Sequence, residues 1–228
     1  MRIFTTLAFK GVLDELRARI EASCGTPLER VLDPTAVMLE RIHNGERGDI
    51  AILTAQGIDA LIADGYLVGA TKVDLARSLV GIAVRAGAPK PDISTIEALT
   101  LTLHEARSVV YSKGGASGIF FSGLLDRLGL RAMVDAKAIV IPSGFTAEPV
   151  ARGDAELAVQ QLSELMAVPG VEIAGPLPPG AQESLLFSGA AFMGTGAPGQ
   201  AVGVLTLLAD ASVAPVFTRK GLLPMAMS

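Results

Sequence analysis

Three short polar segments share an arrangement that suits the binding of an anion. In each, a strand or loop is expected to end, hydroxyl-bearing or small residues follow, and a helix is expected to begin. The first turn of a helix leaves amide N–H groups without internal partners and carries partial positive charge, so a neighbouring hydroxyl completes an anion pocket. The candidate ligand-binding residues on this argument are Thr5, Thr6, Thr35, Ala116 and Ser117.

The same residues have a simpler interpretation as helix caps. Ser and Thr are ordinary N-cap residues, so each segment taken alone could serve the helix and nothing else. Two glycines, Gly114 and Gly115, precede Ala116 and would let the backbone approach a ligand closely. The recurrence of the arrangement in three segments is what keeps the anion-binding hypothesis open beside the capping one.

Other kinds of chemistry find little support in the sequence. The single cysteine, Cys24, excludes an internal disulfide, and two histidines with one cysteine leave too few ligands for a His/Cys zinc site. The segment 194–199 matches G-x-G-x-x-G, but no strand follows its helix and residues 214–219 hold no acidic residue. No G-x-S-x-G motif surrounds any serine. We therefore expect no metal and no cofactor.

Composition and charge narrow the classes of partner. The chain has 228 residues, with 19 Lys and Arg against 23 Asp and Glu, so its formal net charge is −4. Such a balance does not predict nucleic-acid binding. Aromatic residues make up 4% of the chain and tryptophan is absent, which leaves few stacking platforms. The partner we expect is a small anionic ligand.

The mean hydropathy of +0.48 raises the question of a membrane. The most apolar region, residues 185–217, is interrupted by glycines, Pro198, Gln200 and Asp210, whereas a bilayer helix needs about 20 nearly uninterrupted apolar residues. We expect no direct membrane insertion. The first residues also lack the order of a signal peptide, so the sequence as written predicts a cytoplasmic protein, or a periplasmic one if a leader was removed.

The elements that must position these residues follow an alternating pattern. Strands are expected at 2–7, 28–32 and 49–53, with helices at 11–22, 35–44 and 57–64 between and after them. A second α/β series follows residue 94. Strands are expected there at 108–111, 138–141, 155–159 and 171–174, and helices at 94–103, 117–128, 147–152 and 163–166. This order predicts mainly parallel sheets flanked by helices.

Two extended runs, 66–87 and 184–192, connect the two series, and helices near 200–208 and 211–220 end the chain. We interpret the runs as two crossover strands that form a hinge between two lobes. Lobe one would hold residues 1–78 plus 193–228, and lobe two residues 79–192. A cleft between such lobes is a usual place for a small ligand, so Thr5, Thr6 and Thr35 could hold one anion together with Ser117.

Several segments resemble the molybdate-type solute-binding proteins of ABC transporters, which have the type 2 periplasmic-binding-protein fold. The resemblance covers nearly the whole chain. The segments are Thr5-Thr6-Leu7-Ala8-Phe9-Lys10-Gly11, Ile42-His43-Asn44-Gly45-Glu46-Arg47-Gly48-Asp49, Gly115-Ala116-Ser117-Gly118, Arg152-Gly153-Asp154-Ala155-Glu156-Leu157-Ala158-Val159-Gln160-Gln161 and Ala214-Pro215-Val216-Phe217. The resemblance implies a two-lobed clamshell in which hydroxyls and backbone amides hold a tetrahedral oxyanion, and it implies an ABC permease as partner if the protein is exported.

Carried over by position, the resemblance assigns ligand contacts to Thr6 or Thr5, Thr35 and Ser117. The family often has a tyrosine hydroxyl late in the chain, where this sequence reads Gln160-Gln161, which makes Gln161 a candidate donor. The segment Val159-Gln160-Gln161 resembles a side branch of the family that lies near aconitate isomerase.

Two functions follow as hypotheses. The first is a solute-binding protein for a small anion, either a tetrahedral oxyanion such as molybdate or a small organic carboxylate. The alternative is an isomerase that shifts a proton on a small tricarboxylate. Possible anchors are Lys10, Arg77 and Lys113, and possible bases are His104, Tyr111 and Glu148. An intracellular sensor domain is a third reading, ranked last because no DNA-binding segment precedes the domain.

Overall fold

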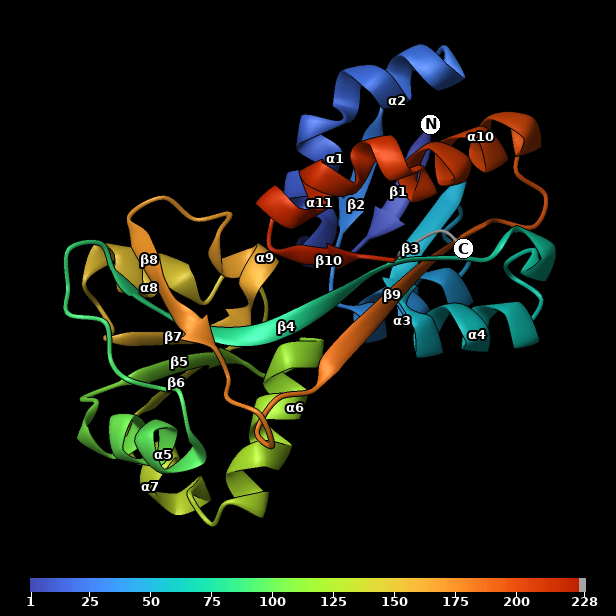
Figure 1. The fold of residues 1–228 in the computed structure, drawn as a ribbon. Helices are drawn as coiled ribbons and strands as arrows, with labels where there is room; N and C mark the ends of the chain where they lie inside the picture. Colours follow the sequence, from blue (N-terminus) through green and yellow to red (C-terminus); the bar gives the residue numbers. More distant parts are fainter. Residues whose placement is uncertain (226–228) are drawn as a thin grey trace. The chain divides into compact units, whose positions relative to one another are not determined.

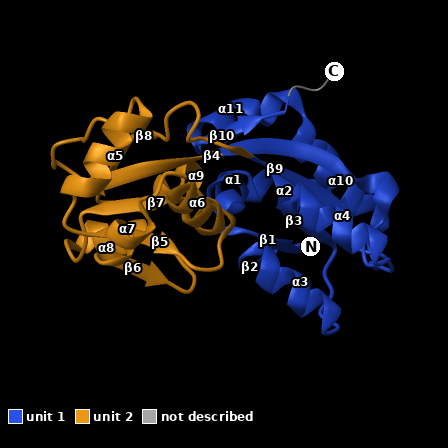
Figure 2. Cartoon of the chain, turned by 90° about the horizontal axis from the view of Figure 1, so that it is seen from below, with its two compact units in different colours: residues 1–78, 185–228 blue, residues 79–184 orange. Residues whose placement is uncertain are grey.

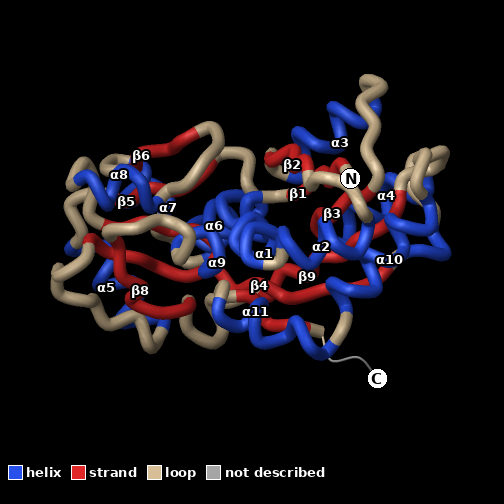
Figure 3. Tube along the Cα trace, turned by 90° about the horizontal axis from the view of Figure 1, so that it is seen from above, coloured by secondary structure: helices blue, strands red, loops and turns tan. Residues whose placement is uncertain are grey.

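The computed structural model describes residues 1–225, in which helices and strands alternate along most of the chain (Figures 1 and 3). The chain divides into two compact units (Figure 2). Unit one holds residues 1–78 and the chain from Leu185 onward, and unit two holds Leu79–Ser184. The strand β4 (Val73–Arg85) belongs to unit one in its first half and to unit two in its second half.

Unit one is an α/β layer structure. Its strands besides β4 are β1 (Arg2–Thr5), β2 (Glu29–Leu32), β3 (Ile50–Thr54), β9 (Ser184–Ala191) and β10 (Leu222–Pro224). Its helices are η1 (Leu7–Phe9), α1 (Lys10–Glu15), α2 (Arg17–Cys24), α3 (Thr35–His43), α4 (Ala55–Ala63), η2 (Gly69–Thr71), α10 (Pro198–Ala209), η3 (Ala211–Val213) and α11 (Ala214–Arg219). Strand β1 is central and pairs in parallel with both β2 and β3. The returning strands β9 and β10 pair antiparallel with β3 and β4.

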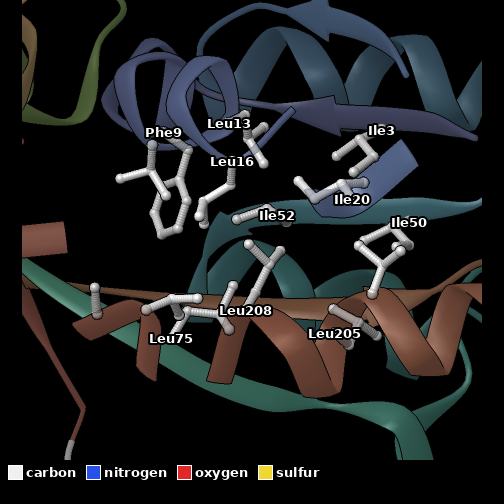
Figure 4. Packing of buried hydrophobic residues seen from close by; sticks show 14 of the residues in the cluster. Ile3, Phe9, Leu13, Leu16, Ile20, Ile50, Ile52, Leu75, Leu205 and Leu208 are labelled. Carbon is white, nitrogen blue, oxygen red and sulfur yellow. The ribbon is translucent and has the colours of Figure 1, made fainter. Parts of the chain in front are cut away.

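Successive residues of β1 and β3 point to opposite faces of this sheet, and both faces are buried. Ile3, Ile50 and Ile52 pack with α1, α2, α10 and α11 in one hydrophobic cluster (Figure 4). Phe4 and Ala51 pack with α3 and α4 in a second cluster. This two-sided burial explains why these strands are continuous apolar runs in the sequence. Because the strands are apolar along their length, polar side chains are found at the strand ends.

Unit two repeats the layer plan. Its strands besides β4 are β5 (Val109–Ser112), β6 (Ala138–Ile141), β7 (Leu157–Gln161) and β8 (Val171–Pro176). Its helices are α5 (Ile96–Glu105), α6 (Ala116–Arg127), α7 (Arg131–Asp135), α8 (Ala147–Arg152) and α9 (Leu162–Leu165). Strand β5 is parallel to β6 and β7, and β4 pairs antiparallel with β7 and β8. Val109 and Tyr111 pack with α5 and α6, while Val110 packs with α8 and α9.

The predicted fold class is confirmed: the chain is α/β, with sheets flanked by helices and parallel pairing at β1, β2, β3 and at β5, β6, β7. The long strands β4 and β9 and the short β8 and β10 add antiparallel pairs that the periodicity alone did not specify. Helix α7 and strand β10 were not predicted. Both are short, at five and three residues, so their sequence patterns are weak.

Several predicted elements have different bounds in the structure: the helix predicted at 211–220 is η3 followed by α11, and the extended run predicted at 66–87 contains η2. The helix predicted at 11–22 is two helices that break at Leu16, which adopts φ −87° and ψ 0°. The strand predicted at 2–7 ends at Thr5, because residues 7–9 turn at once into the helix η1. Residues 185–192, assigned to lobe two from the sequence, lie in unit one, where β9 pairs with β3 from Thr54 to Ile50.

Within residues 1–225 no single helix is long and apolar enough to cross a membrane. Helices α10 and α11 reach the required length and composition only as a pair, and they are bent by 57° relative to each other. Both helices contribute buried side chains, among them Leu205 and Phe217, to the core of unit one.

Candidate anion-binding site

Buried side-chain oxygens without a hydrogen-bond partner gather at the ends of strands. In the described part of the chain these atoms are the hydroxyls of Thr5, Thr6, Ser78, Ser112 and Ser163 and the Oε1 atom of Gln161. All except the Ser78 hydroxyl lie at, or within two residues of, the carboxyl end of β1, β5 or β7. Buried polar groups in proteins are nearly always hydrogen-bonded, so unsatisfied groups at one kind of position call for an explanation.

In unit one the unsatisfied hydroxyls follow the central strand. Thr5 ends β1 in register with Leu32 of β2 and Ile52 of β3, so all three parallel strands end at the same edge. Thr6 comes next, with φ −89° and ψ 165°, and begins η1 without its side chain capping that helix. The carboxyl edge of parallel strands is the usual place for ligands in α/β sheets. Thr5 and Thr6 therefore place two free hydroxyls where a ligand would bind.

Thr35 and Thr54 are engaged at the same edge of unit one. The Thr35 hydroxyl accepts a hydrogen bond from the Thr54 amide at 3.4 Å, and the Thr54 hydroxyl accepts one from the Gly57 amide at 3.4 Å. Thr54 is thus the N-cap of α4, as Ser and Thr commonly are. Thr35 is the first residue of α3 and is half-buried, so its hydroxyl ties the end of β3 to the start of α3. Thr35 therefore has a structural role in unit one and is also a candidate ligand-binding residue.

In unit two the equivalent position lies between β5 and α6. Ser112 ends β5, and a Cβ atom built on Gly115 would lie 2.5 Å from the Ser112 Oγ atom and 4.0 Å from the Ser117 Oγ atom. A Cβ atom on Gly118 would lie 1.7 Å from the Ser112 carbonyl oxygen. The two glycines therefore allow the first turn of α6 to press against the end of β5. Ser117 is 1% exposed, and Ala116 is the first residue of the helix.

Strand β7 lies beside β5 in parallel, with Val110 opposite Ala158. Ser112 and Gln160 each lie two residues beyond this pair on the two neighbouring strands. Gln160 is buried, and its side chain receives hydrogen bonds from the Thr146 amide at 2.8 Å and the Thr146 hydroxyl at 3.0 Å. Gln161 is 3% exposed and ends β7. Ser112 and Ser117 thus lie close together at the end of β5, and Gln161 ends the neighbouring parallel strand.

A buried acid, Glu164, completes the polar group in unit two. Its side chain is 5% exposed, and its Oε2 atom accepts a hydrogen bond from the Gln161 amide at 3.3 Å. Burial raises the pKa of the Glu164 carboxyl to about 8. Only hydrogen bonds from the Gln161 amide and the Gln160 side chain act in the opposite direction. Near neutral pH this carboxyl is therefore held mainly in its protonated form.

Glu164 was not predicted as a site residue, although the sequence places an acidic residue within the helix predicted at 163–166. An acidic residue three positions after the end of a strand, in the first turn of a short helix, is typical of helix capping and usually lies in solvent. The burial that changes its chemistry comes from the packing of α9 against β7 and β8, which no local pattern encodes. Ser112 and Ser163 were not predicted as site residues either, because their importance depends on burial, which follows from tertiary packing.

The predicted bases are poorly suited to acid–base catalysis at this edge. His104 and Glu148 are exposed on helices α5 and α8. The Tyr111 hydroxyl donates to the Asp135 Oδ1 atom at 3.2 Å, and burial raises the pKa of Tyr111 above its usual value. Among the predicted anchors, Lys10 pairs with Asp14 at 2.8 Å, and Lys113 is exposed. Within residues 1–225 no group of three or more His, Cys, Asp or Glu residues could hold a metal ion.

Comparison with solved structures identifies the fold. The periplasmic molybdate-binding protein of Azotobacter vinelandii superposes with a TM-score of 0.82 at 16% identity over 100% of both chains. The sulfate-binding protein of Mycobacterium tuberculosis superposes with a TM-score of 0.74 at 15% identity, covering 99% of this chain and 86% of that one. The chain thus has the fold of periplasmic binding proteins.

Sequence comparison identifies the family. The family model described as bacterial extracellular solute-binding protein matches residues 1–223. An aconitate isomerase from Pseudomonas sp. is 36% identical over 231 residues, which covers 99% of this chain and 88% of that protein. The chain therefore belongs to the family of bacterial extracellular solute-binding proteins, and the resemblance seen in its sequence motifs is confirmed.

Proposed function

We propose that this protein binds a small anion rich in oxygen, either a tetrahedral oxyanion or a small organic carboxylate, at the carboxyl ends of its strands. The observation that carries the proposal is the set of unsatisfied buried hydroxyls of Thr5, Thr6, Ser112 and Ser163 at those ends. A hydrogen bond to a charged group contributes about 1.5–3 kcal/mol, so a few such donors suffice for useful affinity. The amides that begin α3 and α6, including those of Thr35, Ala116 and Ser117, would add donors.

Neutral donors suit a protein that must both bind and release its ligand. A buried arginine or lysine would carry a desolvation cost when the site is empty, whereas a hydroxyl costs far less. Among residues 1–225 no Lys or Arg side chain is buried. As a member of an extracellular family, the protein would deliver its ligand to an ABC permease when it is exported, which we propose as its partner.

A thermal-shift screen tests the proposal. At a concentration about 100 times its dissociation constant, a ligand raises the free energy of unfolding by about 2.7 kcal/mol. The panel should hold molybdate, tungstate, sulfate, cis-aconitate, trans-aconitate and citrate at equal ionic strength. We expect a clear rise in melting temperature with at least one of them. A flat response to all six would overturn the proposed binding function.

A second function is favoured by specific observations. The aconitate isomerase from Pseudomonas sp. matches this chain over 99% of its length at 36% identity, and the unit-two group contains a buried carboxyl. We propose as an alternative that the ligand is an aconitate-like tricarboxylate and that the protein isomerises it. Incubation with cis-aconitate followed by proton NMR tests this alternative: trans-aconitate should appear only with protein present, and its absence would reject turnover.

A further inference from the structure

We propose that the Glu164 carboxyl is the catalytic group that carries the proton in an allylic shift on a small unsaturated polycarboxylate. This inference rests on the isomerase function proposed above. It assigns the buried acid a part in the reaction itself, beyond any hydrogen bond that its protonated form can donate to an anion.

The position of Glu164 supports this role. The residue follows the end of β7 by three positions, and its Oε2 atom is 3.3 Å from the Gln161 amide at that end. Strand β7 is the parallel neighbour of β5, whose end carries the free hydroxyl of Ser112. The free hydroxyl of Ser163 precedes Glu164 in the same helix. An ionisable carboxyl thus lies within the group of unpartnered donors of unit two.

Glu164 is also singular in its electrostatic surroundings. Among the described residues it is the only Asp, Glu, Lys, Arg or His side chain that is buried. Helix α9 packs against β7 and β8, and its Leu165 also packs in one cluster with β4, β5 and α8. Strand β7 presents the neutral Gln160 and Gln161, and Glu172 of β8 is exposed and paired with Lys90 at 3.2 Å. The charged residues Arg85 of β4 and Glu148 and Arg152 of α8 are exposed. The hydrogen-bond partners of the Glu164 carboxyl are the Gln161 amide and the Gln160 side chain, and both are neutral.

Glu164 and Gln161 form a capping box at the start of α9, but this structural role does not require a glutamate. Glutamine serves at the same capping position and would make the same hydrogen bond with the Gln161 amide without the cost of a buried acid. A carboxyl kept without a counter-ion is what acid–base catalysis uses, because its pKa is brought toward the working pH. With a pKa of about 8, Glu164 can both take up and release a proton near neutral pH.

The proposed step balances without any co-reactant. The Glu164 carboxylate removes a proton from the methylene carbon beside the carbon–carbon double bond, and the electrons of that C–H bond form a new double bond. The electrons of the former double bond form a C–H bond at its far carbon, with the proton returned by the Glu164 carboxyl. The negative charge that develops spreads into the substrate carboxylate, where the hydroxyls of Ser112 and Ser163 can donate.

The test compares the full chain with three variants on cis-aconitate as the probe. The variants are Glu164→Gln, Glu164→Asp and, as a matched control, Glu105→Gln, which changes an exposed glutamate at the end of α5 in the same unit. Proton NMR in D2O follows both conversion to trans-aconitate and loss of substrate C–H signals by exchange. Calorimetry gives the affinity, and circular dichroism verifies the fold of each variant.

We expect Glu164→Gln to slow conversion and exchange roughly 10²–10⁴-fold. Its affinity should stay within about threefold of the wild type. Glu105→Gln should behave as the wild type. The wild-type kcat/KM should rise with pH through a pKa near 8, and Glu164→Asp should retain a rising limb at lower rate. The Asp variant carries the test if the Gln variant does not fold.

The failures are distinguishable. If the wild type converts cis-aconitate and Glu164→Gln does so at an unchanged rate, the assignment of Glu164 is overturned while the isomerase function stands. If the wild type binds cis-aconitate but shows neither conversion nor exchange, the isomerase function falls and the inference falls with it. If the wild type does not bind cis-aconitate at all, the proposed substrate class is wrong.

Discussion

The two units of this chain place hydroxyls at the carboxyl ends of parallel strands, yet they differ in one chemical respect. Unit one offers Thr5 and Thr6, with Thr35 and Thr54 tied into the same edge, and every member is neutral at any ordinary pH. Unit two offers Ser112 and Ser163 in the same role and adds a buried carboxyl, Glu164. In the proposed site, the first set would supply hydrogen bonds alone, whereas the second set also includes a group that can exchange a proton.

This difference allows ligand affinity and proton exchange to be studied separately. Affinity that comes from hydroxyls should depend little on pH, because no donor in unit one titrates. Among the side chains named at these strand ends, only Glu164 changes its protonation state between the ordinary pKa of a glutamate and about 8. Variants in the two units therefore test binding and proton chemistry independently.

The largest effect should come from the close approach of α6 to β5 in unit two. In Gly118→Ala the new Cβ atom would lie 1.7 Å from the Ser112 carbonyl oxygen, so the helix must shift. We expect a loss of about 3 kcal/mol or more in the free energy of unfolding, measured by urea denaturation. Gly11→Ala in unit one is the comparison, since its new Cβ atom meets only the flexible Lys220 side chain at 3.3 Å.

Gly123→Ala provides the control within the same helix. No atom lies within 4 Å of a Cβ built there, and alanine favours a helix over glycine by up to about 1 kcal/mol. We expect it to be neutral or stabilising. Equal stability of Gly118→Ala and Gly123→Ala would show that the helix does not lie against Ser112 as described.

The next effect concerns pH and distinguishes the two units directly. Because the pKa of Glu164 is raised from 4.5 to about 8, the folded protein holds a proton that the unfolded chain releases between these values. The contribution is fully present below pH 4.5 and is lost as the pH rises toward 8, so the free energy of unfolding should fall across that window. The fall attributable to Glu164 should be on the order of a few kcal/mol.

Denaturation curves of the wild type and Glu164→Gln across this pH range check the sign. The difference between the two should shrink to nothing at low pH and favour Glu164→Gln at high pH. A Thr5→Val variant in unit one should follow the wild-type pH dependence. A pH dependence that survives unchanged in Glu164→Gln would contradict the burial of this carboxyl.

A smaller effect should mark the unsatisfied hydroxyls. Removing a buried hydroxyl that has no partner also removes its desolvation cost, so Thr5→Val and Ser112→Ala should leave the ligand-free protein as stable as the wild type or stabilise it by up to about 1 kcal/mol. Thermal unfolding of the ligand-free variants measures this. A clear destabilisation of both would mean that these hydroxyls already have partners in the folded protein.

The smallest effect separates capping from free hydroxyls within unit one. Thr54 caps α4 through the Gly57 amide, so Thr54→Ala should cost about 1 kcal/mol in unfolding free energy. It should leave ligand affinity nearly unchanged, since its hydroxyl is already engaged. A loss of affinity in Thr54→Ala with no loss of stability would reverse the roles assigned to Thr54 and Thr5.

Much of the fold could be predicted from the sequence because the strands are buried on both faces and the helices are amphipathic. The apolar runs around Ile3, Ile50 and Val109 and the helix from Thr35 follow local periodicity, and they match the structure closely. The pairing of β10 with β4 depends on contacts between segments that are distant in the sequence. Such contacts cannot be predicted from the local sequence pattern.

The candidate site was predicted in part. Thr5, Thr6 and Ser117 were identified by their places next to helix starts. The structure sets Thr5 and Thr6 at the end of β1 and Ser117 in the first turn of α6, whereas their roles in ligand binding stay predictions. Ser112 and Glu164 escaped because their importance depends on burial, and burial is a property of tertiary packing. The expectation that both sets of residues hold one ligand also stays a prediction.

The most direct test of the account is calorimetric titration of an anion that raises the melting temperature, into the wild type, Thr6→Val, Ser112→Ala and Thr54→Ala. The variant in the unit that holds the ligand removes one donor to a charged group and should weaken binding roughly tenfold or more, while Thr54→Ala should bind as the wild type does. If Thr6→Val and Ser112→Ala both bind with wild-type affinity, the unsatisfied strand-end hydroxyls are not the anion site.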